Sequence, residues 1–305
     1  MAIDFSRLFF TAIIVSSLSI VDFGSASASD PAPNRDQQVD LSKRLVIAGR
    51  QRMLAEGMAS KLCFAEAGVR REESLSELYL MWNIFNWYHS GILLGNVQLE
   101  LKSETDPYVV AAWRTLDNEW WDLKSLYEPV LDGVAISPAS FAKAQSSTEE
   151  VTQLSDNLVA ALRSAYSKRL GQRGFGATLL IDLYERQRML SHRIAKNTCL
   201  MSTGDKSPER RADLAEMMSV FDNSLAAFQN GMADFGIPKP PNEEIATALA
   251  SVKEAWDGAK PLISRTAIGA VLNTQELTVL AETNDRIVVA MTAAINGLVL
   301  ASETN

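Results

Sequence analysis

Histidine and cysteine are both scarce in this chain of 305 residues, which has two of each. His89 and His192 stand in no paired metal-ligand spacing, so neither a zinc nor a di-iron centre is expected, and a Cys-x-x-Cys-His haem motif is lacking. The chain also lacks a Gly-x-Ser-x-Gly elbow, a P-loop and a dinucleotide-binding motif. These absences argue against an enzyme and predict neither a metal nor a cofactor.

A basic surface is also lacking, because the formal net charge is -8. Nucleic acids and anionic membranes attract proteins with a positive field, so neither is expected as a partner. An anion bound by this chain would have to be captured by a local cluster of arginines.

Long apolar runs are few, and the clearest one lies at the N-terminus. Arg7 precedes an apolar stretch over residues 8–21, and Ala26-Ser27-Ala28 forms an A-x-A cleavage signal. The apolar stretch is shorter than the roughly 20 residues that span a bilayer. Residues 1–28 are therefore predicted to be a signal peptide, with an uncleaved anchor as the alternative. No other apolar run is expected to span, so the mature protein is predicted to be soluble and periplasmic.

The alternating Val/Ile/Thr stretches typical of β-strands are missing too. Apolar residues instead recur every three or four positions in stretches that favour helices. We expect an all-α fold with four helices before a Gly171–Gly176 linker and four after it. The helical stretches are separated by clusters of glycine and proline at 132–138, 171–176, 204–208 and 236–241.

An internal repeat is the strongest feature that the sequence does contain. The pentapeptide RQRML occurs at 50–54 and again at 186–190, 136 positions later. The same spacing relates other pairs of residues. The third and fourth helices of the two halves align with each other at slightly shorter spacings. The repeat predicts two tandem four-helix bundles of up-down topology, over residues 29–170 and 171–305. The aligned pairs are Ala59/Ala195, Cys63/Cys199, Phe85/Phe221, Gly95/Gly231, Trp121/Trp256 and Asp156/Asp285.

The two arginines of each motif cannot serve one site from one straight helix, because Arg50 lies 200° from Arg52 around the helix axis. Arg52 shares a stripe with the small residue Gly49, which allows close approach of a ligand or another backbone. Arg52 and its counterpart Arg188 are therefore the candidate ligand-binding arginines. Arg50 and Arg186 are predicted to point into their own bundles as structural residues. The alternative for Arg52 and Arg188 is a solvated or salt-bridged surface arginine, with Glu56 one turn from Arg52 as the expected partner.

The stretches LVIAGRQRMLAEGMASK and LLIDLYERQRMLSHRIAKN resemble the first-helix motif of the NarX-like sensor domain. That domain occurs in nitrate/nitrite sensor kinases and in PilJ-type type IV pilus chemotaxis transducers. The resemblance implies that a nitrate-like oxyanion sits between two motif helices. Its ligands would be Arg52 and Arg188, with Gly49 as the close-approach glycine. Glu185 stands in the second motif where the first has Gly49, which puts a negative charge beside that site.

These expectations combine into an exported sensory module that binds a small anion such as nitrate or nitrite. It would report to a separate membrane sensor or envelope protein. The alternative is a structural or adaptor protein of the envelope, tied to pilus or chemoreceptor machinery and without a small ligand.

The two cysteines follow their arginines at the same distance. Cys63 lies 11 residues after Arg52 and Cys199 lies 11 after Arg188. Eleven residues turn the helix by 1100°, close to three full turns, so each cysteine lies on the stripe of its arginine. If the stripes meet around a pseudo-two-fold axis, Cys63 and Cys199 form a disulfide that joins the bundles. The alternative is two buried free thiols.

Overall fold

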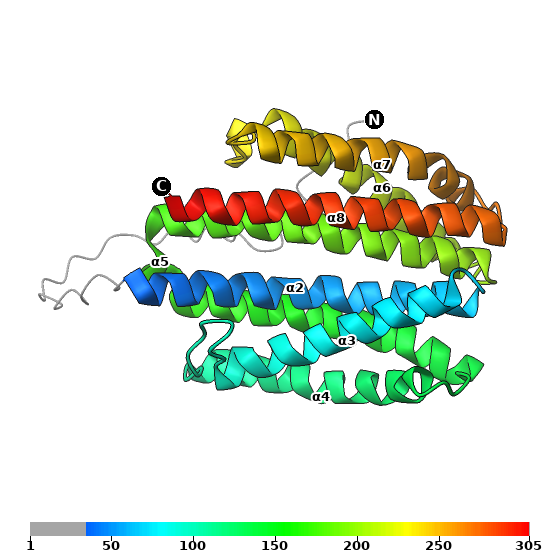
Figure 1. The fold of residues 1–305 in the computed structure, drawn as a ribbon, viewed down its shortest axis with the longest axis horizontal. Helices are drawn as coiled ribbons and strands as arrows, with labels where there is room; N and C mark the ends of the chain where they lie inside the picture. The colour runs from blue at the N-terminus through cyan, green and yellow to red at the C-terminus, as the bar shows by residue number, and fades with distance from the viewer. Residues whose placement is uncertain (1–34, 305) are drawn as a thin grey trace, which may run out of the picture. The chain divides into compact units, whose positions relative to one another are not determined.

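The fold is built from α-helices (Figure 1). The computed structural model describes residues 35–304, without the side chains of residues 35–39, 41–42, 167–175, 177 and 302–304. The predicted signal peptide lies outside these residues. No β-strand forms within the described range, so the all-α prediction is confirmed. The helices are α2 (Arg35–Glu66), α3 (Arg71–Leu94), α4 (Pro107–Leu131), α5 (Pro138–Ser202), α6 (Pro208–Asn230), the 3₁₀ helix η1 (Ala233–Phe235), α7 (Glu243–Ala267) and α8 (Thr274–Thr304).

Three of the helices begin with a polar residue followed by proline. Asp106 accepts hydrogen bonds from the backbone N–H groups of the first turn of α4. Ser137 and Ser207 do the same for α5 and α6. The proline at the first helical position loses no hydrogen bond there and has a suitable φ. Two of the predicted glycine and proline clusters, 132–138 and 204–208, therefore end at a helix start.

Glycine ends α3 and α6 in the same way. Gly95 has φ 77° and Gly231 has φ 75°, values that L-residues rarely adopt. A Cβ atom at Gly95 would lie 2.7 Å from the backbone N of Ser103, and one at Gly231 would lie 2.9 Å from the backbone N of Lys239. Both positions therefore require glycine for two reasons, conformation and close approach of the following loop.

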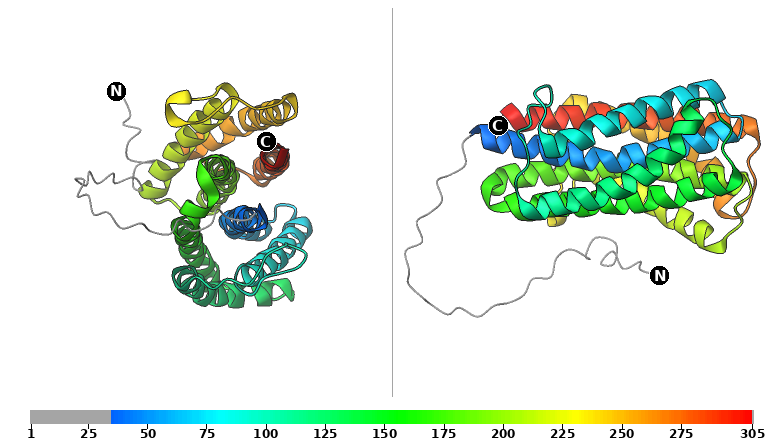
Figure 2. Two further views of the ribbon diagram at one scale, coloured as in Figure 1. Left: turned by 90° about the vertical axis from the view of Figure 1, so that its left-hand side faces the viewer. Right: turned by 90° about the horizontal axis from the view of Figure 1, so that it is seen from below.

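The long helix α5 contributes one arm to each half of the fold. Nη2 of Arg163 lies 2.5 Å from Oδ2 of Asp182, although 19 residues of straight helix would separate them by about 28 Å. The chain therefore reverses direction between these two residues, and the two arms run antiparallel (Figures 1 and 2). The predicted Gly171–Gly176 linker lies in this stretch, and it is helical rather than a break between two helices. Glycine-rich stretches are among the places where helices bend sharply.

Two hydrophobic cores occupy the two halves. The first lies among α2, α3, α4 and the first arm of α5, and the second lies among the second arm of α5, α6, α7 and α8. The helices α2 and α5 pack extensively against each other, and they join the two halves (Figure 2). Residues central to the first core are Leu54, Met58, Phe85, Leu116, Trp120 and Leu162, and those central to the second are Phe221, Leu249, Trp256, Ile263, Met291 and Ile295.

The two cores contain matching aromatic contacts, which show which tryptophans occupy the same place. Phe85 stacks on Trp120 with ring centroids 4.0 Å apart, and Phe221 stacks on Trp256 at 4.1 Å. The tryptophan that corresponds to Trp256 is therefore Trp120, at a spacing of 136. The predicted alignment with Trp121 at 135 is wrong, because Trp121 is 58% exposed. The difference arises because adjacent helical positions point 100° apart, so a slip of one residue moves a side chain from the core to the surface.

One described helix is long and apolar enough to span a membrane by length and composition. Within residues 274–301 of α8, an 18-residue window reaches a mean hydropathy of 1.2, so the expectation that no such stretch follows residue 28 is wrong. Buried core residues such as Leu280, Met291 and Ile295 account for much of this apolar character. A helix that lines a core passes the same test as a membrane span.

Candidate functional site

The two motif helices, α2 and the second arm of α5, lie parallel and in register. Arg50 contacts Glu185, and Cys63 contacts Cys199. The spacing in these pairs is 135 and 136, so both partners advance together along the chain. We call the contact between α2 and the second arm of α5, with the flanking side chains of the first arm, the inter-bundle interface.

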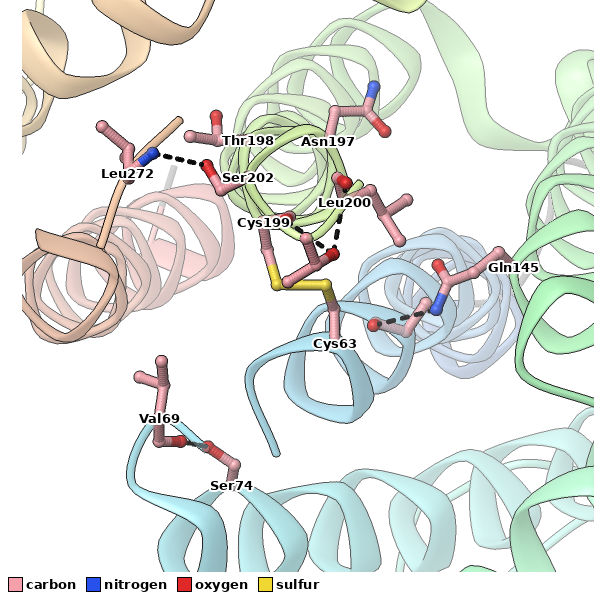
Figure 3. Close-up of a disulfide and its surroundings, with 12 residues drawn as sticks. Cys63, Val69, Ser74, Gln145, Asn197, Thr198, Cys199, Leu200, Ser202 and Leu272 are labelled. Carbon is pink, nitrogen blue, oxygen red and sulfur yellow. Dashed lines mark hydrogen bonds between the residues drawn. A yellow bond between two sulfur atoms is a disulfide. The ribbon is translucent and has the colours of Figure 1, made fainter. Parts of the chain in front are cut away.

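A disulfide joins the two helices at one end of this interface (Figure 3). Cys63 and Cys199 have Cα atoms 6.3 Å apart, and both residues are buried. One turn before Cys63, the backbone carbonyl of Ala59 accepts a hydrogen bond from Gln145 on the first arm of α5, at 3.4 Å. This is the pairing that the eleven-residue spacing predicts, and the two stripes do meet face to face.

Arg52 lies in the middle of the inter-bundle interface and is fully buried. Its Nη1 lies 2.5 Å from Oδ1 of Asp156, its Nη2 donates to Asp182, and its Nε donates to the carbonyl of Gly49 at 3.2 Å. Burial opposes the charged form, but the carboxylates of Asp182 and Asp156 outweigh it and raise the pKa of Arg52 above its ordinary value. The guanidinium is thus permanently charged and paired.

Gly49 provides the space for this pair. A Cβ atom there would lie 3.2 Å from Nη2 of Arg52 and 3.7 Å from Oδ1 of Asp182. The first distance is tighter than an ordinary contact. The predicted close-approach glycine therefore admits an ion pair between side chains of the two motif helices.

Asp182 gathers three arginines around one carboxylate. Besides Arg52, it accepts from Nη2 of Arg163 at 2.5 Å and from Nε of Arg186 at 3.1 Å. Burial would raise the pKa of Asp182, but these three cations lower it well below its usual range. The residue stands in the apolar run Leu-Leu-Ile-Asp-Leu-Tyr, and a lone carboxylate there is the signal by which the sequence could have identified it.

Arg188 is held in a similar way but by different partners. Its Nη2 lies 2.5 Å from Oε2 of Glu185, and its Nη1 donates to Oγ1 of Thr292 at 2.9 Å. Thr292 lies 136 positions after Asp156, so it takes the place that Asp156 has beside Arg52. The predicted alignment of Asp156 with Asp285 is therefore wrong, because Thr292 and not Asp285 lies beside Arg188.

Arg50 and Arg186 do not simply face their own bundles, which corrects the predicted separation of the motif faces. Nη1 of Arg50 donates to the hydroxyl of Tyr88 in its own bundle at 3.3 Å, as predicted, but its Nε donates across the interface to Oε1 of Glu185 at 3.1 Å. Nη2 of Arg186 donates to Oδ1 of Asp156, on the first arm of α5, at 2.8 Å. The prediction failed because a long side chain on the edge of a stripe can reach either neighbour.

Further along the interface lies a second set of buried charges. Nζ of Lys196 lies 2.8 Å from Oε2 of Glu56, and both side chains are fully buried. Nζ of Lys61 lies 2.5 Å from Oδ1 of Asp285 on α8. Between these pairs, burial first and then the charges of Lys61 and Arg188 lower the pKa of His192 to about 3, so this histidine is neutral. Glu56 therefore does not pair with Arg52 as the surface alternative supposed.

The space beside the arginines is small. A cavity of about 10 Å³ is lined by residues that include Gly49, Arg163, Asp182 and Glu185. That volume is close to the minimum that holds one water molecule. A cavity of this size does not admit a four-atom oxyanion. No group of His, Cys, Asp and Glu suited to a metal ion occurs in the described part of the chain.

Comparison with known proteins gives one family for the second half of the chain. Residues 186–285 match the family model described as type IV pili methyl-accepting chemotaxis transducer N-term, or PilJ. This segment is PilJ-like. It begins at Arg186, within the second motif, and reaches Asp285 on α8. No curated protein matches the chain.

The PilJ-like segment contains residues 186–202 of the second motif helix together with α6, α7 and part of α8. It therefore supplies Arg188 to the inter-bundle interface. The match supports the PilJ part of the resemblance and indicates a sensory or signalling role. PilJ is not an enzyme family.

Proposed function

We propose that the protein is an exported signalling adaptor of the bacterial envelope, made of two PilJ-like bundles in tandem. It would act through contacts with a membrane or envelope partner, without a small ligand. The observation that carries this proposal is the pairing of Arg52 with Asp156 and Asp182. In the resembled sensor domain a small anion lies between motif arginines, whereas here carboxylates of the same chain pair with them.

The tandem arrangement gives a reason for this substitution. Two separate chains can use a ligand to adjust how their motif helices meet. Here the helices belong to one chain and are joined by the Cys63–Cys199 disulfide and by buried ion pairs. Buried ion pairs in good geometry specify how two elements dock, even where they add little net stability. The inter-bundle interface would thus be held in a single state.

A thermal-shift screen of the mature protein against nitrate, nitrite, sulfate and phosphate tests this proposal. A ligand at 100 times its dissociation constant stabilises the folded state by about 2.7 kcal/mol. If the protein is an adaptor, no oxyanion should raise the midpoint of thermal unfolding more than sodium chloride does at equal ionic strength. A saturable rise of this midpoint with one oxyanion would instead favour a sensor of that oxyanion.

The second candidate is a sensor of a small oxyanion, such as nitrate or nitrite, and one observation favours it. Five arginines (Arg50, Arg52, Arg163, Arg186 and Arg188) meet three carboxylates (Asp156, Asp182 and Glu185), which leaves a surplus of two positive charges. Such a surplus in a chain of net charge -8 would attract an anion. In this candidate, the anion would displace Asp182 and would be held by Arg52 together with Arg163 or Arg186.

A further inference from the structure

The outer face of α3 carries a row of exposed apolar side chains. Leu80, Trp87 and Leu94 are 59%, 42% and 68% exposed. They are spaced by seven residues, which is 20° short of two full turns, so they lie nearly in a line along the helix. We call these three residues the α3 stripe. No Asp, Glu, Lys or Arg occurs between residues 78 and 99.

The corresponding positions on α6 are polar, so the fold does not require apolar residues on the outer face of this helix. Residues 136 positions after the α3 stripe are Glu216, Asn223 and Asn230, and all three are exposed. The two helices occupy matching places, since each is the second helix of its half and ends at a matching glycine. The α3 stripe is therefore a property of the first half alone. Exposed apolar side chains that line up along one helix face mark a candidate interaction site.

Neighbouring aromatic side chains widen the α3 stripe. Tyr79, next to Leu80, stacks on Trp82 with ring centroids 6.3 Å apart. Nζ of Lys124 on α4 lies 5.4 Å from the ring centroid of Trp82 and 4.1 Å from that of Trp121. Tyr79 and Trp121 are themselves exposed. Together these side chains expose on the order of 500 Å² per molecule.

The order of residues in the stripe is the same in both directions. Leu80 lies seven positions before Trp87, and Leu94 lies seven positions after it. If two copies of α3 pack antiparallel around a two-fold axis at Trp87, Leu80 of each copy meets Leu94 of the other. A two-fold interface requires such self-complementarity. Because the stripe is uncharged, the pairing buries no charged residue of α3.

We propose that the α3 stripe is a homodimer interface, in which two copies of this chain pack their α3 helices antiparallel with Trp87 at the centre. Two such faces bury on the order of 1,000 Å², the lower end of the range for specific interfaces. The dimer is therefore weak, with a dissociation constant in the micromolar range. Dimerisation through α3 does not depend on whether the inter-bundle interface binds an anion. The dimer can therefore be tested separately from the proposed function.

Sedimentation velocity of the mature protein over about 1–200 μM tests the dimer. A concentration-dependent shift from one to two chains is expected, and a single chain at every concentration would overturn the proposal. Flotation with phosphatidylcholine vesicles tests whether the α3 stripe binds lipid instead of a second copy of the chain. If the protein binds the vesicles through Trp87 and stays monomeric, the α3 stripe is a lipid-contacting surface and the proposal is wrong.

A pair of double variants tests the antiparallel arrangement. In Leu80→Glu/Leu94→Lys, each introduced carboxylate faces an introduced ammonium group of the second copy. In Leu80→Glu/Leu94→Glu, the same apolar area is lost but carboxylates face each other. The first variant should dimerise at least ten-fold more tightly than the second. Equal dissociation constants would exclude the antiparallel pairing.

A matched control uses the corresponding face of α6. Glu216→Lys/Asn230→Glu changes charges at the positions equivalent to Leu80 and Leu94, and it should leave the dissociation constant unchanged. Circular dichroism of every variant checks that the helices are intact. Because all the substituted positions are exposed, loss of folding is not expected to obscure the comparison.

Discussion

Replacing Asp182 by alanine removes the carboxylate that three arginines share. Arg52 would then keep only Asp156 as an anionic partner while remaining fully buried. Breaking a buried ion pair by removing one partner costs about 3–5 kcal/mol, because the remaining charge is left uncompensated. We expect Asp182→Ala to lower the free energy of unfolding by this amount, with the helical content unchanged in the folded state.

The same variant should gain an anion site. The alanine leaves a space the size of a carboxylate in front of Arg52, Arg163 and Arg186. Formate has the shape of the missing group, and guanidinium groups bind such oxyanions through two parallel hydrogen bonds. Saturating formate should therefore recover about 2.7 kcal/mol at 100 times its dissociation constant. The wild-type protein should show no such stabilisation.

Urea unfolding in sodium formate and in sodium chloride at equal ionic strength measures the rescue. Asp285→Ala is the matched control, because Asp285 also pairs with two cations, Lys61 and Arg70, but lies away from the arginine cluster. Formate should stabilise Asp182→Ala and leave Asp285→Ala unchanged. Equal effects on both variants, or a loss below 1 kcal/mol for Asp182→Ala, would refute the reasoning.

Three further predictions concern the disulfide, the histidines and the N-terminus. Replacing Cys63 and Cys199 by serine should lower stability by up to about 5 kcal/mol in urea unfolding, since the bridge closes a loop of 136 residues; two reactive thiols in denatured, unreduced wild-type protein would contradict the bridge. Burial lowers the pKa of His89 to about 4 and that of His192 to about 3. As the pH falls, these histidines are therefore protonated in the unfolded chain at a higher pH than in the folded one. Stability should therefore be full above pH 6.5 and fall by about 1.4 kcal/mol per pH unit for each histidine towards pH 4; a flat profile would show that these histidines are not neutral. Mass spectrometry of exported protein should find a chain that begins near Ser29, and intact residues 1–28 in a membrane fraction would contradict cleavage.

The sequence predicted those features that depend on the period of a helix. The spacing of apolar residues indicated an all-α fold. The 1100° between Arg52 and Cys63, repeated between Arg188 and Cys199, placed both cysteines on the stripes that meet in the structure. Both inferences use only the rotation of 100° per residue, which the helices retain.

Features that depend on which helices are neighbours could not be read from the sequence. Asp156 lies 104 residues from Arg52, and Asp182 lies 130 residues away. Only the packing of both arms of α5 against α2 brings these residues together. The linker predicted at the reversal within α5 is helical, because glycine lowers helix propensity but does not exclude a helix. The alignment of Trp121 with Trp256 failed because burial, rather than residue type, distinguishes Trp120 from its neighbour.

The most direct test of the account is a crystal structure of the mature protein grown in sodium nitrate. Its central claim is that carboxylates of the chain itself are the ligands of the motif arginines. The account predicts that Asp182 and Asp156 remain within hydrogen-bonding distance of Arg52, and that no nitrate lies between Arg52 and Arg188. A nitrate ion bound to Arg52, together with Arg188 or with Arg163 or Arg186, and with Asp182 turned away, would contradict it.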